Sequence, residues 1–273
     1  LGSEKKRFKM CYVDADTILH SASISLQQSY INAKHLKSGR VKRFENKTSF
    51  GVRGKKIIPN GWLDSTNQEM VSKGKPPFTI EDFELEECFE IKPEFSNHKD
   101  AIEHGLSSIG FSVGGIKKYA DSEDYRLIIS GGNGNYRNGL AKTLKYKGNR
   151  TDKPILYSEL KEAMVEQYKH KIILADNCEA EDICGWKAKE QVDLFGEDFS
   201  KWEACISFID KDVLMVYSPS INYNKFEEGF IFPSKLDCSR HLVSQIVAGD
   251  QSCDNIQGLP NLTEEVTKKF GLR

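Results

Sequence analysis

Short apolar runs alternate with helical patterns along this chain, and this alternation restricts the possible folds more than any other feature. The apolar runs are KMCYV (9–13), YRLII (125–129), KIILA (171–175) and ACISFI (204–209), with VLMVY (213–217) after the last. The helical patterns lie at 97–118, 157–170, 179–195 and 239–248. Strands that alternate with helices predict an α/β fold with a mainly parallel central sheet and helices on both faces. Ligands of such sheets bind at the carboxyl ends of the strands.

Residues 21–120 do not follow this rhythm. They contain two short β-like pieces, KIIPN (56–60) and FELEECFEI (83–91), and several Gly and Pro breaks. We interpret them as a long insertion after the first strand. Basic side chains are in local excess at 34–56, so the insertion is either a solvated decoration or an element that guides a polyanionic substrate.

Composition excludes several classes of protein. The 39 basic and 40 acidic side chains give a net charge of −1, so nucleic-acid binding would have to use a local basic patch. Seven cysteines without a C-x-x-C pair argue against a disulfide framework or a structural zinc site and favour a reducing cytoplasm. No apolar run approaches the roughly 20 residues of a membrane span. Residues 1–3, Leu-Gly-Ser, resemble the scar of an expression tag.

Acidic residues are grouped at four element boundaries. The groups are Asp14 with Asp16, Glu179 with Glu181 and Asp182, Asp210 with Asp212, and Asp250 with Asp254. In an extended chain, residues two apart point the same way. On a helix, Glu179 and Asp182 share a face, whereas Glu181 points elsewhere unless the first turn is distorted. One acidic group alone can be structural, because carboxylates at a helix start favour the helix dipole.

Four such groups at one edge would repel one another unless cations neutralised them. Oxygen ligands without His or Cys favour Mg²⁺ or Mn²⁺ over zinc. Two such ions suit phosphodiester hydrolysis, because they can generate hydroxide and stabilise both the attacking and leaving oxygens. This inference requires that the groups converge in space.

A basic segment, 136–153, lies between the second and third apolar runs. It interleaves Tyr136 and Tyr146 with six cations: Arg137, Lys142, Lys145, Lys147, Arg150 and Lys153. It is either a solvated loop or a surface for a polyanion, with cations for phosphates and aromatic faces for unpaired bases.

The order of these motifs resembles the 5′-nuclease family, the flap endonucleases and 5′→3′ exonucleases, and especially its bacteriophage members. The matching pieces are YVDAD (12–16), YR…YKGNR (136–150), EAEDICGWKA (179–188), ISFIDKDVLMV (206–216) and GDQSCDNIQGLP (249–260). The resemblance implies a PIN-like nuclease domain over 4–248, with a flexible arch at about 136–156. It also implies a degenerate or truncated helix-three-turn-helix region at 249–273.

The resemblance further implies roles for individual residues. Two divalent ions, Mg²⁺ or Mn²⁺, would be held by the carboxylates Asp14, Glu179, Glu181, Asp182, Asp210, Asp212, Asp250 and Asp254. Lys147 would contact the scissile phosphate, and Arg150 would assist it or position the strand. The other nucleic-acid contacts are expected at Arg137, Lys142, Lys145, Tyr146 and Lys153.

The function implied is metal-dependent cleavage of DNA, or of RNA–DNA hybrids, at 5′ ends, flaps or single-strand/duplex junctions. We expect a monomer that acts in phage replication, repair or recombination in the host cytoplasm, without a membrane. Three departures from the family pattern stand out. Gly132 replaces a usual Asp, a loss that Asp16 would compensate; Asp250 and Asp254 are four apart instead of three; and the sequence after GLP lacks the usual glycines.

Two other interpretations remain open. A haloacid-dehalogenase-like phosphatase would use the D-x-D-x-T at 14–17, with Asp14 as nucleophile, Asp16 as general acid and Ser130 as its second motif. It would give no role to YKGNR, EAED or IDKD. A nuclease fold without activity that binds branched DNA is the other alternative, because of Gly132.

Overall fold

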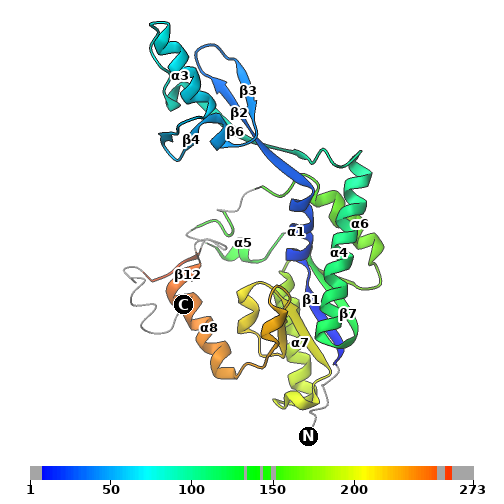
Figure 1. Ribbon diagram of the computed structural model, residues 1–273. Helices are drawn as coiled ribbons and strands as arrows, with labels where there is room; N and C mark the ends of the chain where they lie inside the picture. Colours follow the sequence, from blue (N-terminus) through cyan, green and yellow to red (C-terminus); the bar gives the residue numbers. More distant parts are fainter. Residues whose placement is uncertain (1–7, 132–133, 142–143, 149–151, 251–255, 260–273) are drawn as a thin grey trace. The chain divides into compact units, whose positions relative to one another are not determined.

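The structure is a computed structural model, and it describes residues 8–131, 134–141, 144–148, 152–250 and 256–259 (Figure 1). The chain divides into two compact units. One consists of Leu1–Ala22 and Ile102–Arg273, and the other of Ser23–Ala101. Each is described by itself.

The first unit is built on a six-stranded sheet with the strand order β11-β10-β9-β1-β7-β8. The strands are β1 (Phe8–Asp14), β7 (Ser122–Ser130), β8 (Ile172–Ala175), β9 (Ala204–Phe208), β10 (Ser220–Asn222) and β11 (Phe230–Ile231). All neighbours pair in parallel except β10 and β11, which are antiparallel. The predicted mixed α/β architecture with a mainly parallel central sheet is therefore confirmed.

Helices lie in the connections between these strands and after the last of them. They are α1 (Asp16–Ser25), α4 (His98–Ala120), α5 (Arg137–Leu140), α6 (Tyr157–Gln167), α7 (Ala180–Phe195) and α8 (Lys235–Ala248). On α4 the buried residues Ile109, Val113, Ile116 and Ala120 recur every three or four positions, which gives the helix one apolar face. Helix α7 packs against β1, β7, β8 and β9, where Ile183 and Cys184 join Ile128 and Ile206 in a buried cluster.

The run VLMVY (213–217) does not continue as a strand. Residues Lys211–Met215 form a 3-10 helix, and the next strand begins at Ser220. The side chain of Asp210 accepts a hydrogen bond from the Asp212 amide at 3.1 Å. This local bond turns the backbone before a strand can form. A short antiparallel pair, β12 (Gly249–Asp250) and β13 (Ile256–Gln257), follows α8.

The second unit has its own antiparallel sheet. Its strand order is β3 (Val41–Phe44), β2 (Gln27–His35) and β6 (Phe83–Ile91), and β6 coincides with the β-like piece FELEECFEI. The remaining elements are α2 (Lys47–Phe50), β4 (Val52–Arg53), β5 (Lys56–Ile57), α3 (Trp62–Ser72) and a 3-10 turn at Ile80–Asp82.

Aromatic packing forms the core of this second unit. Phe50 lies 5.2 Å from Phe44 and 5.7 Å from Trp62, measured between ring centroids. The backbone at Gly61, just before α3, lies against the backbone at Gly51. A Cβ on Gly61 would be only 2.2 Å from the Gly51 Cα. The expected insertion, 21–120, also included all of α4, which belongs to the first unit from Ile102 onward. Among the described residues, no helix is both long and apolar enough to cross a membrane.

Candidate active site

Asp14 is the last residue of β1, the strand between β9 and β7, and its side chain is buried. Its relative exposure is 2%, and its Oδ1 accepts a hydrogen bond from the Asp16 amide at 3.2 Å. The Tyr223 hydroxyl donates to the Asp14 backbone oxygen at 3.1 Å. Burial, followed by repulsion from Asp16, raises the pKa of Asp14 to about 7, with further contributions from Asp210 and Glu179.

Glu181, in the first turn of α7, has the most strongly raised pKa of the carboxyl groups in the site. Burial raises its pKa to about 9, and repulsion from Asp14, Glu179 and Asp210 adds to the effect. These carboxylates come from the end of β1, the start of α7 and the turn after β9. Glu181, which helical spacing separates from Glu179 and Asp182, thus interacts with the Asp14 carboxylate across the sheet edge.

Glu179 and Asp182, at the start of α7, pair with basic side chains. Asp182 accepts the Glu179 amide at 3.0 Å and receives both terminal nitrogens of Arg137, at 2.7 and 2.8 Å. Burial opposes ionisation of Asp182, but the hydrogen bonds from Arg137 and Glu179 outweigh it and lower its pKa. The same bond to Asp182 raises the pKa of Arg137.

Glu179 is contacted by two residues of the basic segment. The Tyr146 hydroxyl donates to its Oε2 at 2.9 Å, and the Lys147 ammonium donates to its Oε1. Tyr146 is only 8% exposed, a placement that leaves little of its ring for stacking on a base. Lys147 has a positive φ of 54°, an uncommon conformation for a residue other than Gly.

Asp16 and Asp212 are each held by a neighbour. Asp16 accepts the Ser130 amide at 3.0 Å and also the Ser130 hydroxyl, at the carboxyl end of β7. Asp212 accepts the Gln245 side chain from α8. Ser130 enters the sequence interpretation only as a phosphatase motif, and Tyr223 and Gln245 are absent from it. No local pattern marks these last two, because their partners are far away in the sequence.

The remaining predicted residues are placed as follows. Lys145 and Lys153 are exposed, and the Lys153 ammonium lies 4.3 Å from the centroid of the Tyr157 ring. Only the backbone of Asp250 is described, in β12. The positions outside the described residues are Gly132, Lys142, Arg150 and Asp254.

The donor set fits a hard divalent cation in its chemistry. Its ligands would be carboxylate oxygens, as Mg²⁺ and Mn²⁺ prefer. Burial and neighbouring carboxylates raise the pKa values of Asp14 and Glu181, and a bound cation would offset both effects. In the described part of the chain, no three His, Cys, Asp or Glu residues are already arranged to hold an ion. Instead, Arg137 and Lys147 neutralise the carboxylates at the start of α7.

Comparisons with known proteins show a structural likeness but no match to a family. No family model and no curated protein matches the chain. A solved structure of a bacteriophage T5 flap endonuclease, a pseudo-enzyme–product complex with DNA and metal ions, is similar at 14% identity and a TM-score of 0.41. The similarity covers 60% of this chain and 66% of that one, just under two thirds of its length. Similarity at this level establishes neither a family nor a function.

Proposed function

We propose that this protein is a divalent-metal-dependent nuclease that hydrolyses phosphodiester bonds of DNA. The observation that carries the proposal is the convergence of the buried Asp14 with Glu179, Glu181 and Asp210 at one edge of a parallel sheet, where their charges interact. Buried carboxylates that repel one another cost stability, and their concentration where α/β proteins bind ligands favours a catalytic role.

Asp14, Glu181 and Asp210 are the residues we propose as the central metal ligands, with Glu179 and Asp182 beside them. When bound, Mg²⁺ or Mn²⁺ would supply hydroxide and stabilise the charge that develops on the phosphate oxygens. Asp14 is the most buried of these groups, so it would position the ion, and the Tyr223 bond to the Asp14 backbone supports the end of β1.

Arg137 and Lys147 are suited to the phosphate of the substrate. Both pair with carboxylates at the start of α7. A divalent cation would compete with them for these carboxylates and so release them for the substrate. Lys147 would then make a point contact with the scissile phosphate, while Arg137 can hold a phosphate through two parallel hydrogen bonds.

The finer assignment is also a proposal. It is a PIN-like 5′-nuclease with 5′→3′ exonuclease and flap endonuclease activity on 5′ ends, flaps and junctions, including RNA–DNA hybrids. It would act as a monomer in phage DNA replication. Its support is the order of the five sequence motifs together with the placement of Asp14, Glu181 and Asp210.

Two substrates assayed side by side test the proposal. A labelled 5′-flap duplex and a generic phosphate monoester are each incubated with the protein and Mg²⁺, with and without excess EDTA. We expect cleavage of the flap only, abolished by EDTA. Hydrolysis of the monoester alone would favour the phosphatase, and flap binding without cleavage would favour the inactive fold.

The variant Glu181→Gln links the activity to this site. It replaces a carboxylate that would bind the ion with an amide of nearly the same shape, so we expect cleavage to fall at least about 100-fold. Without metal, the melting temperature at neutral pH should stay level, because a carboxyl with a pKa of about 9 is already protonated there. The matched control is Glu166→Gln on α6, whose side chain is 80% exposed. Near-wild-type turnover of Glu181→Gln at saturating Mg²⁺ would remove Glu181 from the site.

A further inference from the structure

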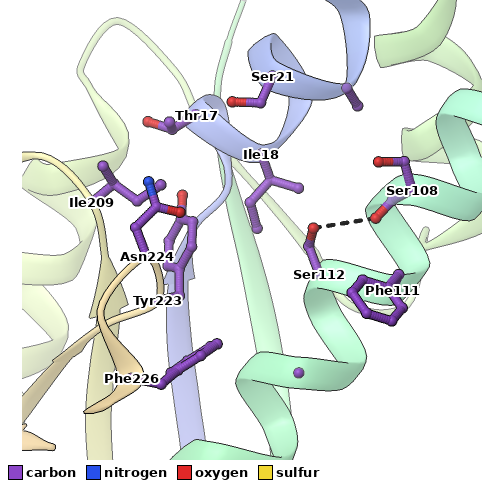
Figure 2. Close-up of a pocket in the computed structure, with 12 residues that line it drawn as sticks. Thr17, Ile18, Ser21, Ser108, Phe111, Ser112, Ile209, Tyr223, Asn224 and Phe226 are labelled. Atoms are coloured by element: carbon purple, nitrogen blue, oxygen red, sulfur yellow. Dashed lines mark hydrogen bonds between the residues drawn. The ribbon is translucent and has the colours of Figure 1, made fainter. Parts of the chain in front are cut away.

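A pocket of about 250 Å³ lies in the first unit, between α1, α4 and the segments after β9 and β10 (Figure 2). Thr17 and Ser21 approach it from α1, and Phe111 and Ser112 from α4. Tyr223 faces these residues across the open space. The proposed nuclease mechanism does not use this pocket.

The pocket shares a wall with the carboxylate cluster. Tyr223 lines it and is also the residue whose hydroxyl donates to the Asp14 backbone oxygen at 3.1 Å. The Thr17 side chain hydrogen bonds to Tyr223, and Ile209, another lining residue, directly precedes Asp210. A ligand in the pocket would therefore lie next to the proposed metal ligands.

The lining is neutral and combines aromatic faces with hydrogen-bonding groups. None of the lining residues carries a charge, so the pocket offers no partner for a phosphate. Phe226 is stacked on Tyr119 at 4.1 Å between ring centroids and 11° between planes, which holds one wall in place. Phe111, with 86% of its surface exposed, borders the pocket on α4.

Polar side chains that line the pocket could hydrogen bond to a ligand. Within the described ranges, the exposed side chains of Ser21 and Asn224 have no hydrogen-bond partner in the protein, and the Ser112 hydroxyl donates to the Ser108 backbone oxygen at 3.2 Å. The volume lies just below the roughly 300–1,000 Å³ of pockets for drug-sized ligands. A flat, neutral ring with donors and acceptors on its edge matches this size and chemistry.

We propose that the pocket takes one unpaired nucleobase of the nucleic-acid substrate, so that the adjoining phosphate lies at the carboxylate cluster. This inference rests on the proposed function and deepens it. Base–aromatic contacts supply the affinity, and Ser21 and Asn224 supply hydrogen bonds to the base edge. The pocket would set which nucleotide of a single strand is held next to the metal site.

Two variants alter the pocket without touching the carboxylates. Gly115→Leu fills it, because a Cβ at Gly115 already lies 3.8 Å from the Phe226 ring, and leucine favours the helix more than glycine does. Phe111→Ala removes an exposed wall at little cost in folding. The control is Leu194→Ala on α7, which removes another largely exposed apolar side chain (70%) outside the pocket.

The measurement is equilibrium binding in EDTA at low ionic strength, so that cleavage plays no part. The probe is a fluorescent single-stranded oligonucleotide in which one abasic site is moved along the strand. For the wild type, we expect one abasic position to weaken binding by about five-fold or more, the lower end of what one stacked base contributes.

The variants should remove this dependence on position. Gly115→Leu should bind the intact strand as weakly as the wild type binds the abasic one, with no further loss at the abasic position. Phe111→Ala should lose part of the affinity, and Leu194→Ala none. Should Gly115→Leu fail to fold by circular dichroism, the comparison of Phe111→Ala with Leu194→Ala decides.

Two results would overturn the pocket assignment: wild-type binding that is absent or independent of abasic position, or an undiminished abasic penalty in both pocket variants. Failure of the proposed function is distinguishable from these. Position-dependent binding without any Mg²⁺-dependent cleavage would keep the base pocket and reject the nuclease, whereas cleavage without position dependence would do the reverse.

Discussion

At the scale of single residues, the start of α7 shows how this protein balances charge. Arg137 and Lys147 contact Asp182 and Glu179, while burial and nearby carboxylates raise the pKa values of Asp14 and Glu181. The two cations therefore stabilise one half of an acidic cluster whose other half has no cation of its own among the described residues.

Loss of the Arg137 guanidinium should destabilise the metal-free protein. The Arg137–Asp182 pair is two-thirds or more buried, with side-chain exposures of 29% and 18%, so Arg137→Met should lower the free energy of unfolding by about 2 kcal/mol. The control is Lys189→Met, because Lys189 and Asp193 form an exposed pair on α7 (73% and 61%), for which we expect less than about 0.5 kcal/mol. Urea unfolding in EDTA measures both, and equal losses would contradict the prediction.

Lys147 should affect the rate of cleavage more than binding. An ammonium that meets developing charge on the phosphate stabilises the transition state more than the ground state, so Lys147→Ala should lower the single-turnover rate by about 100-fold. Lys153→Ala, an exposed cation of the same segment, should weaken binding only by about one phosphate contact. If saturating enzyme restores the rate of Lys147→Ala, Lys147 only positions the substrate.

At the scale of elements, an ion cluster joins β7 to the residue before β8. The Lys171 ammonium binds Asp124 at 2.5 Å, and the Arg126 guanidinium binds it at 3.0 Å. The Lys171 bond outweighs the effect of burial and, with the Tyr125 amide and Arg126, lowers the pKa of Asp124 from 3.8 to about 2. The cluster helps to hold β8 at the edge of the sheet.

This depressed pKa predicts a loss of stability in acid. Since the folded protein binds the proton less readily than the unfolded chain, the contribution is complete above about pH 4 and disappears as the pH falls towards 2. We expect about 1 kcal/mol, less than the full shift implies, because the side chain is 33% exposed. Asp124→Asn should lack this part of the pH dependence in urea unfolding followed from pH 5 to about pH 2. Parallel curves for both proteins would contradict it.

At the scale of the whole molecule, the chain contains two units, each with a hydrophobic core. The second unit, Ser23–Ala101, buries Ile31, Phe44, Phe50 and Leu63 against one another and against Trp62. These contacts all lie within the second unit. We therefore expect this unit to fold without the six-stranded sheet of the first unit.

A fragment of residues 23–101 should therefore fold on its own. Its NMR amide spectrum should be dispersed, although its stability will be modest for its size. Leu63→Ala, which empties a fully buried position, should cost about 2–5 kcal/mol and collapse the spectrum. Val71→Ala, at a side chain on α3 that is 59% exposed, should leave it intact. A collapsed spectrum for the unmodified fragment would show that the unit depends on the rest of the chain.

Local sequence was sufficient to predict the main elements. Four strands of the six-stranded sheet appear as apolar runs, as KMCYV does for β1, because a strand buried on both faces needs apolar residues throughout. The short strands β10 and β11 were not predicted. The pattern 179–195 predicted α7 because periodicity and the acidic first turn are properties of neighbouring residues. Asp14 and Asp210 could be placed at strand ends for the same reason.

Only the tertiary structure decided which of these residues meet. Asp182 and Arg137 are 45 positions apart, and Asp14 and Tyr223 are 209 apart, so their contacts depend on strand order and register, which no local pattern encodes. The same applies to the interaction of Glu181 with Asp14, to the burial of Tyr146, and to the neutral pocket beside Tyr223. Propensity and periodicity act between neighbours in the chain, whereas a site is assembled by the packing of distant segments.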